Sequence, residues 1–251
     1  MDNITVCVCD GSVNGIFTAI YKAWEIGTSR TKISIGMNDM ELFCDYIYVE
    51  ADEELAAKVV RTIANKLYGE CYEKVMMAVV SDDLERGECI YRLLIKGFKV
   101  GPAIINDLTD YHVRRVYELG RRVWKEQHHY LGFVRFREID NGVLAAKIEP
   151  KADILELITE HFSDRLKTEN FIILDTKRKR AAIHRMSGDA FITDLTEEEL
   201  DEYGFEKAGG DEYIDLWNCF FNTIAIEERK NPKLQRNLMP LRYRRYMEIK
   251  N

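Results

Sequence analysis

Two adjacent histidines stand just before a run of aromatic and basic residues near the middle of the chain. His128 and His129 are followed by a glycine and then by alternating aromatic and basic residues that include Arg135 and Arg137. An imidazole titrates near neutral pH and can transfer a proton or bind a metal, whereas a guanidinium grips phosphate or carboxylate in a bidentate manner. Aromatic faces can stack on nucleobases. A reactive or anion-binding surface is therefore expected here first.

Acid-base chemistry is one use of these side chains. His128 and His129 can serve as general acid or base, and Asp164 stands beside Arg165 within about one helical turn of His161. That spacing suits a histidine-carboxylate pair, and it equally suits a salt bridge at a helix end. The two adjacent histidines can likewise be structural residues at the end of a helix. The sequence predicts His128, His129 and Asp164 as catalytic candidates and leaves these structural alternatives open.

Phosphate binding is the other use, because the basic residues are unevenly distributed. The chain carries a net charge of −7, yet eight basic residues and one acidic residue after position 228 give its last segment, 229–251, a charge of +7. Such a basic end fits nucleic acid, and it can also dock on the acidic surface of its own chain. The predicted nucleic-acid contacts are Arg121, Arg122, Arg135, Arg137, Arg165, Arg229, Lys230, Arg236, Arg242, Arg244 and Arg245.

Composition limits the class of protein. The chain has 251 residues, of which 46% are hydrophobic and 31% charged, as in soluble globular proteins of one large or two small domains. It lacks an apolar run near the roughly 20 residues that a membrane helix needs and begins without a signal-peptide pattern, so we expect a cytoplasmic protein. The six cysteines are scattered and predict reduced, mostly buried thiols. No metal site and no cofactor are predicted.

The first third of the chain predicts an α/β subdomain over residues 1–84. A strand over 4–9 ends in Asp10-Gly11-Ser12 and leads into a helix that contains Ile16 to Trp24. A polar loop is expected over 27–39. The remaining expected elements are a strand over 46–49 and helices near 55–67, 70–81 and 86–97.

A mixed domain is expected over residues 85–251, where a long helix leads to the histidines. Its apolar stripe predicts a start near residues 106–107, and Gly132 is expected to separate it from a strand. The further elements predicted are a hairpin of strands 133–138 and 143–148, a helix through Phe162 that begins with a capping box of Asp153 and Glu156, a second hairpin of 171–174 with 181–185, and an amphipathic helix over 213–224. The fold class expected is α+β, with mixed helices and a ββαββ-type antiparallel sheet in the second half.

Several motifs together resemble a known family. They are Asp10-Gly11-Ser12, H-H-Y-L-G-F-V-R-F from His128, I-E-P from Ile148, H-F-S-D-R from His161, and the stretch from Ile224 that ends in L-R-Y at Tyr243. The chain resembles the bacterial family of DNA-repair or DNA-metabolism proteins encoded beside a DNA-modification radical-SAM protein. Its second half resembles a domain of unknown function that some relatives carry fused to uracil-DNA-glycosylase-like domains. Arg244 departs from the family pattern, which usually has tryptophan there.

The resemblance and the residues together give three hypotheses for function. The first is an accessory protein that binds DNA and acts with the radical-SAM partner. The second is an independent hydrolase or glycosylase-like enzyme on DNA or nucleotides that uses His128 or His129 with Asp164. The third is a non-catalytic scaffold of the radical-SAM partner. Because the chain lacks the C-x-x-x-C-x-x-C motif of radical-SAM enzymes, radical chemistry is expected of the partner alone.

Overall fold

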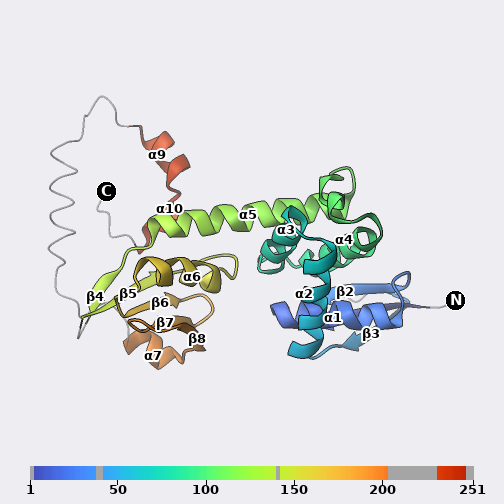
Figure 1. Cartoon of the computed structure of the whole chain (residues 1–251), viewed down its shortest axis with the longest axis horizontal. Helices are drawn as coiled ribbons and strands as arrows, with labels where there is room; N and C mark the ends of the chain where they lie inside the picture. Colours follow the sequence, from blue (N-terminus) through green and yellow to red (C-terminus); the bar gives the residue numbers. More distant parts are fainter. Residues whose placement is uncertain (1–2, 38–41, 140–141, 203–230, 247–251) are drawn as a thin grey trace. The chain divides into compact units, whose positions relative to one another are not determined.

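The computed structural model describes residues 3–37, 42–139, 142–202 and 231–246 (Figure 1). The chain divides into two compact units. Unit 1 comprises Met1–Lys125 with Lys151–Asp153, and unit 2 comprises Glu126–Pro150 with Ile154–Asn251. This division falls within one helix, α5 (Tyr111–Phe133). The boundary between residues 84 and 85 that the sequence predicts stays a prediction.

A parallel three-stranded sheet forms the start of unit 1. Its strands are β1 (Ile4–Cys9), β2 (Thr31–Ile35) and β3 (Cys44–Tyr48), with β1 in the centre. The strands predicted over residues 4–9 and 46–49 are confirmed. Both neighbours pair with β1 in parallel.

The expectation of a polar loop over 27–39 is wrong, because this segment contains β2. Thr31, Ile33 and Ile35 are buried and alternate with half-buried residues, which is the period of a strand. At this edge of the sheet the backbone N–H of Ile33 donates to the carboxylate of Glu88 at 2.7 Å. A side chain thereby satisfies a donor that a further strand would otherwise have to satisfy.

Helices make up the rest of unit 1, and they lie where the periodic apolar residues predicted them. They are α1 (Val13–Ile26), α2 (Glu53–Lys66), α3 (Glu70–Val79) and α4 (Arg86–Val100), followed by the 3-10 helix η1 (Pro102–Asn106). Two of them begin at a side-chain cap: Ser12 accepts from the N–H of Gly15, and Asp52 accepts from the N–H of Leu55. Their buried faces join those of the sheet in one core.

The long helix α5 begins and ends later than predicted. Its start is fixed by Asp110, whose carboxylate accepts from the N–H groups of His112 and Val113 at 3.0 and 3.2 Å. At the other end the helix runs through Gly132 to Phe133. The predicted strand over 133–138 is therefore wrong in its first half, and only Arg137–Ile139 form strand β4.

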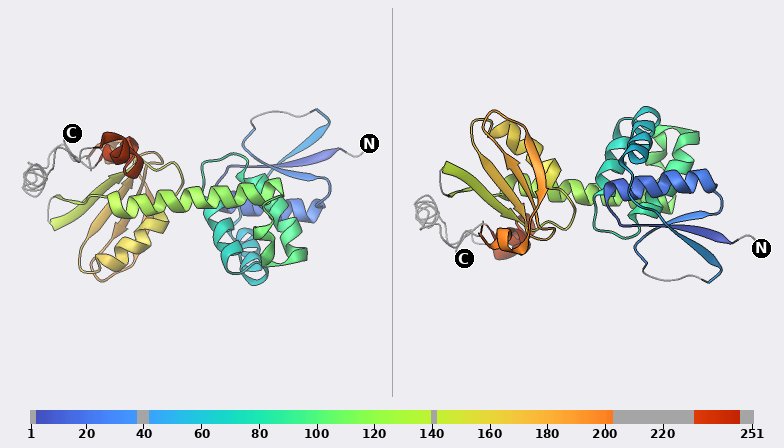
Figure 2. Two further views of the ribbon diagram at one scale, coloured as in Figure 1. Left: turned by 90° about the horizontal axis from the view of Figure 1, so that it is seen from above. Right: turned by 90° about the horizontal axis from the view of Figure 1, so that it is seen from below.

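Unit 2 is built on a five-stranded sheet in the order β4-β5-β6-β7-β8. Only β5 and β6 pair in parallel, and helix α6 (Leu155–Arg165) connects them along one face of the sheet (Figure 2). Both predicted hairpins and the α+β class are confirmed. The last strand was missed, so the order of elements is ββαβββ. The other strands are β5 (Val143–Ile148), β6 (Phe171–Asp175), β7 (Arg180–His184) and β8 (Ala190–Asp194).

The remaining described elements of unit 2 are short helices, α7 (Glu197–Glu202), α9 (Pro232–Leu238) and α10 (Leu241–Arg244). The predicted capping box of α6 is wrong, because Ile154 stands at the N-cap and no side chain accepts a hydrogen bond there. The helix predicted over 213–224 lies outside the described residues. No helix among the described residues is long and apolar enough to cross a membrane.

Candidate nucleic-acid interface

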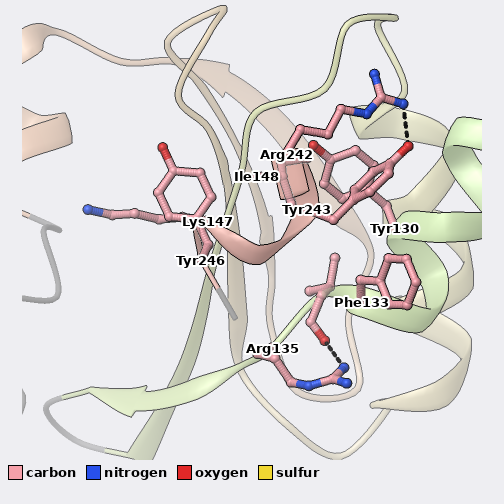
Figure 3. Close-up of a pocket in the computed structure, with 9 residues that line it drawn as sticks. Tyr130, Phe133, Arg135, Lys147, Ile148, Arg242, Tyr243 and Tyr246 are labelled. Carbon is pink, nitrogen blue, oxygen red and sulfur yellow. Dashed lines mark hydrogen bonds between the residues drawn. The ribbon is translucent and has the colours of Figure 1, made fainter. Parts of the chain in front are cut away.

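A small depression on unit 2 brings together basic and aromatic side chains from segments far apart in the sequence (Figure 3). Helix α5 and the segment after it contribute one side, strand β5 another, and α10 with the next residues a third. Three of the lining residues are cationic and four are aromatic. They are Arg135, Lys147 and Arg242, and Tyr130, Phe133, Tyr243 and Tyr246.

Tyr243 holds the aromatic part of this surface together. It is 4% exposed, and its ring lies 5.0 Å from that of His129, 5.1 Å from that of Tyr130 and 5.5 Å from that of Phe133. Edge-on arrangements at such distances are favourable for aromatic rings. Burial raises the pKa of the Tyr130 and Tyr243 hydroxyls, so both phenols stay neutral at physiological pH. Through Tyr243, helix α10 thus packs on the end of α5.

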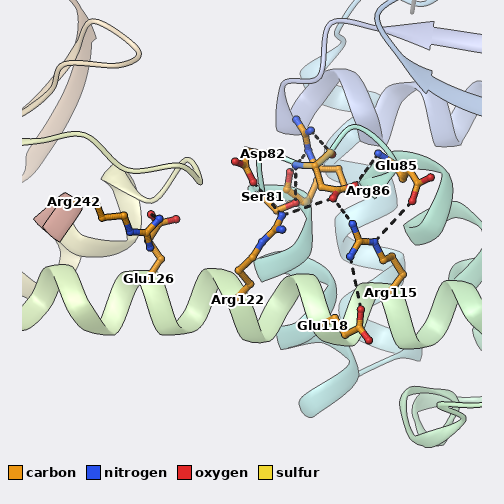
Figure 4. A network of polar contacts seen from close by, with 11 residues as sticks. Ser81, Asp82, Glu85, Arg86, Arg115, Glu118, Arg122, Glu126 and Arg242 are labelled. Atoms are coloured by element: carbon orange, nitrogen blue, oxygen red, sulfur yellow. Dashed lines mark hydrogen bonds and ion pairs between the residues drawn. The ribbon is translucent and has the colours of Figure 1, made fainter. Parts of the chain in front are cut away.

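Ion pairs hold two arginines of the tail against the chain's own carboxylates. Arg242 lies 3.3 Å from Glu126, whose side chain is only 5% exposed (Figure 4). Arg245 pairs with Glu149, and the hydroxyl of Tyr246 donates to the same carboxylate at 3.3 Å. The described part of the tail therefore docks on acidic groups of unit 2, which is the second of the two roles expected from its charge.

The residues around the depression differ in how much of their charge remains available. Arg135 is exposed and donates to the backbone carbonyls of Gly132 and Val134, at 2.9 and 3.0 Å. It lies before β4 and not within a strand, so the strand predicted over 133–138 does not include Arg135. Within the described ranges no carboxylate pairs with Arg135. Its charge is available to an anion from outside.

The three predicted catalytic residues do not come together in one site. His128 is exposed on α5, whereas His129 is half-buried and packs on Phe133 with the ring centroids 5.6 Å apart. Asp164 lies on the exposed side of α6 and pairs with Lys167 at 3.4 Å. In the described part of the chain, Asp164 pairs with neither histidine.

The arginines predicted on the first part of α5 lie in unit 1. Arg122 lies 3.0 Å from Asp82 and 3.8 Å from Asp83, and Arg115 pairs with Asp83 as well (Figure 4). Acidic residues after α3 thus balance the charge of this stretch of helix. Arg121 is exposed.

The other predicted contacts are spread over unit 2. Arg165 and Arg236 are exposed, and Arg137 and Arg244 are half-buried. Arg229 and Lys230 lie outside the described residues. Sequence reasoning missed Tyr130, Lys147, Tyr243 and the two carboxylates, although Tyr130 and Tyr243 stand within the motifs that carry the resemblance.

The thiols and carboxylates give no sign of metal chemistry in the described ranges. No group of three or more histidine, cysteine, aspartate or glutamate side chains is arranged there to hold an ion. The five cysteines described are free, and four of them are buried. Burial raises the pKa of the thiol to about 11 in Cys7 and Cys71 and to about 12 in Cys89, so these groups are neutral near pH 7.

A family model matches residues 84–248, and it describes a domain of unknown function, DUF4130. The chain belongs to this family. The depression of unit 2 lies entirely within the matched residues. No curated protein matches the chain significantly.

Similarity to solved structures is weak. A DHH domain described as a member of a family of ribosomal proteins shares 10% identity at a TM-score of 0.31, with 89% of this chain and 80% of the other covered. A Methanococcus jannaschii protein assigned to the family II inorganic pyrophosphatases shares 13% identity at a TM-score of 0.17, with 81% and 72% covered. Likenesses at this level carry no argument about function.

Proposed function

We propose that this chain is a DNA-repair or DNA-metabolism accessory protein that binds nucleic acid through the depression of unit 2. The observation that supports this is the gathering of Arg135, Lys147 and Arg242 around four aromatic rings on one surface (Figure 3). Cationic side chains provide the sequence-independent part of nucleic-acid affinity by releasing counterions from phosphates. Aromatic side chains beside them offer contacts to exposed bases.

Phosphate is the part of the nucleic acid that this surface fits best. The depression holds only about 10 Å³, enough for about one water molecule, and Tyr243 already packs against three rings of α5. A phosphate group can approach the exposed Arg135 without any movement of these rings. The contact expected is therefore to the backbone, which positions a nucleic acid and does not read its sequence.

The partner we propose is the radical-SAM protein encoded beside relatives of this chain. Without a radical-SAM cysteine motif of its own, this chain would hold DNA while the partner performs the chemistry, in the cytoplasm. The geometry of His128, His129 and Asp164 offers less support for an independent hydrolase or glycosylase, because Asp164 is engaged with Lys167.

Fluorescence anisotropy with labelled DNA, single- and double-stranded, tests the binding. Arg135→Glu should weaken affinity and reduce the slope of log K against log salt by about 1, the value for loss of one phosphate contact. Arg185→Glu is the matched control, because Arg185 is exposed on the same unit and lies outside the depression. Equal affinities and slopes for the two variants would contradict the proposal. Binding of the radical-SAM partner without any DNA binding would indicate the scaffold role.

A further inference from the structure

Unit 1 has a second hollow, between α1, α2 and the end of α4, which has no part in the function proposed above. It offers about 370 Å³ of space, within the range of about 300–1,000 Å³ found for small-molecule sites. Three aromatic residues line it, Tyr21, Trp24 and Phe98, together with two lysines, Lys58 and Lys66. Most of these residues precede position 84, so the family's domain does not include them.

Trp24 gives the hollow a fixed aromatic wall. Its ring lies 5.3 Å from that of Phe98 and 6.2 Å from that of Tyr91, which meets it edge-on at 78°. Tyr91 is fully buried, so this contact is part of the core. Trp24 nevertheless remains 38% exposed. An indole that is held by two ring contacts and is still partly exposed offers a surface on which a planar ring can stack.

The charge around the hollow is positive. The ammonium of Lys58 lies 6.0 Å from the ring of Tyr21, and that of Lys66 lies 5.4 Å from the ring of Phe98. Neither lysine forms an ion pair with a carboxylate of the described residues. Glu25 is the acidic residue in the lining, and Lys22 balances it at 3.0 Å. Two cations are thus available beside the rings of a chain whose net charge is −7.

We propose that this hollow binds a nucleotide-sized planar aromatic anion, with its ring against Trp24 and its phosphate at Lys58 and Lys66. An aromatic ligand without charge would leave the two lysines unused, and a simple anion would leave Trp24 exposed. A mononucleotide has both a ring for Trp24 and a phosphate for the two lysines. This site is independent of the nucleic-acid surface, because it uses other residues in the other unit.

Isothermal titration calorimetry with adenosine 5′-monophosphate tests the site on the full chain. One molecule should bind per chain with a dissociation constant below about 1 mM, and adenosine and inorganic phosphate, titrated separately, should each bind at least tenfold more weakly. The absence of saturable binding would overturn the proposal. Equal affinity for adenosine and the monophosphate would overturn it too, because the lysines would then have no role.

Variants separate the two contacts. Lys58→Glu combined with Lys66→Glu should weaken monophosphate binding at least tenfold and leave adenosine binding unchanged. Arg61→Glu is the matched control, since Arg61 is exposed on α2 and lies outside the lining. Trp24→Ala should weaken both ligands. Should Trp24→Ala fail to fold, Thr62→Phe, which fills the hollow from α2, provides the same test. Unchanged monophosphate affinity in the double-lysine variant would refute the site.

Discussion

Arg242 of α10 lies against the buried carboxylate of Glu126 on α5, with 3.3 Å between the charged groups. The guanidinium also sits over the ring of Tyr243, 4.6 Å from its centroid. One arginine of the basic tail therefore combines an ion pair with a cation-π contact. This arrangement makes the described tail a structural part of unit 2 before any external anion is considered.

Replacing either partner of this pair should lower stability. Arg242→Ala is expected to cost about 1–3 kcal/mol, because it removes a charge-assisted contact from a buried carboxylate. The value should fall in the lower part of that range, since Arg242 is itself 42% exposed. Urea unfolding of Arg242→Ala, Glu126→Gln and the double variant measures the coupling. Effects that add to within about 0.5 kcal/mol would show that the two side chains do not interact.

The tail offers a way to separate DNA binding from stability. Lys233 and Arg236 are exposed on α9, and neither forms an ion pair within the described residues. Lys233→Glu with Arg236→Glu should weaken DNA affinity and flatten its salt dependence while the melting temperature stays the same. Arg242→Glu should reduce both affinity and melting temperature, because it places an acid against Glu126. DNA affinity is measured by fluorescence anisotropy. If the α9 variant binds DNA as tightly as the parent does, α9 is not part of the interface.

Local patterns predicted most of the helices, because the spacing of apolar residues is contained within a single segment of the chain. The four helices of unit 1 and both hairpins of unit 2 are of this kind. The strand β2 was missed even though Thr31, Ile33 and Ile35 alternate as in a strand, because its five residues lie in a segment, 27–39, that is otherwise polar and rich in turn-forming residues.

The region after the histidines shows the opposite error. Phe133 and Arg135 fit a strand by their alternation, but Phe133 is also four residues after His129, and their rings pack one turn apart on α5. The candidate site depends further on the contact of Tyr243 with Tyr130, which are separated by more than a hundred residues. No spacing in the sequence encodes that contact.

The two adjacent histidines are expected to respond differently to substitution. His129→Ala removes a ring that contacts Phe133 and Tyr243 and should lower stability by about 1–2 kcal/mol. His128→Ala, at an exposed position, should stay within about 0.5 kcal/mol of the parent. Thermal unfolding and DNA anisotropy of both variants provide the test. The activity of this chain mixed with the proposed radical-SAM partner gives a further test. If His128→Ala abolished that activity and His129→Ala did not, His128 would be the functional histidine.

Alkaline pH should destabilise the protein through its buried thiols. Burial raises the pKa of Cys89 from 9.0 to about 12, so the folded state retains its proton while the unfolded state loses it. This contribution is fully present below pH 9 and is lost as pH rises from there toward about 12. Urea unfolding at pH 8, 9 and 10 should show falling stability, and Cys89→Ala should make the fall less steep. An identical slope in that variant would argue against a neutral buried thiol.

Two glycines of α5 should respond in opposite ways to alanine. A Cβ at Gly120 would lie 2.9 Å from the backbone carbonyl oxygen of Lys74 on α3, so α5 and α3 would have to move apart. Because the obstacle is backbone, Gly120→Ala should be destabilising by about 1–3 kcal/mol, although alanine is the better helix former.

Gly132 is the matched control for this substitution, because a Cβ there would meet nothing within 4 Å and the residue lies inside α5. Gly132→Ala should therefore stabilise the protein by up to about 0.5 kcal/mol, less than at a mid-helix position, because Gly132 is the second-to-last residue of α5. Melting temperatures of the two variants decide the matter. A clear loss of stability in Gly132→Ala would contradict a helical backbone at Gly132.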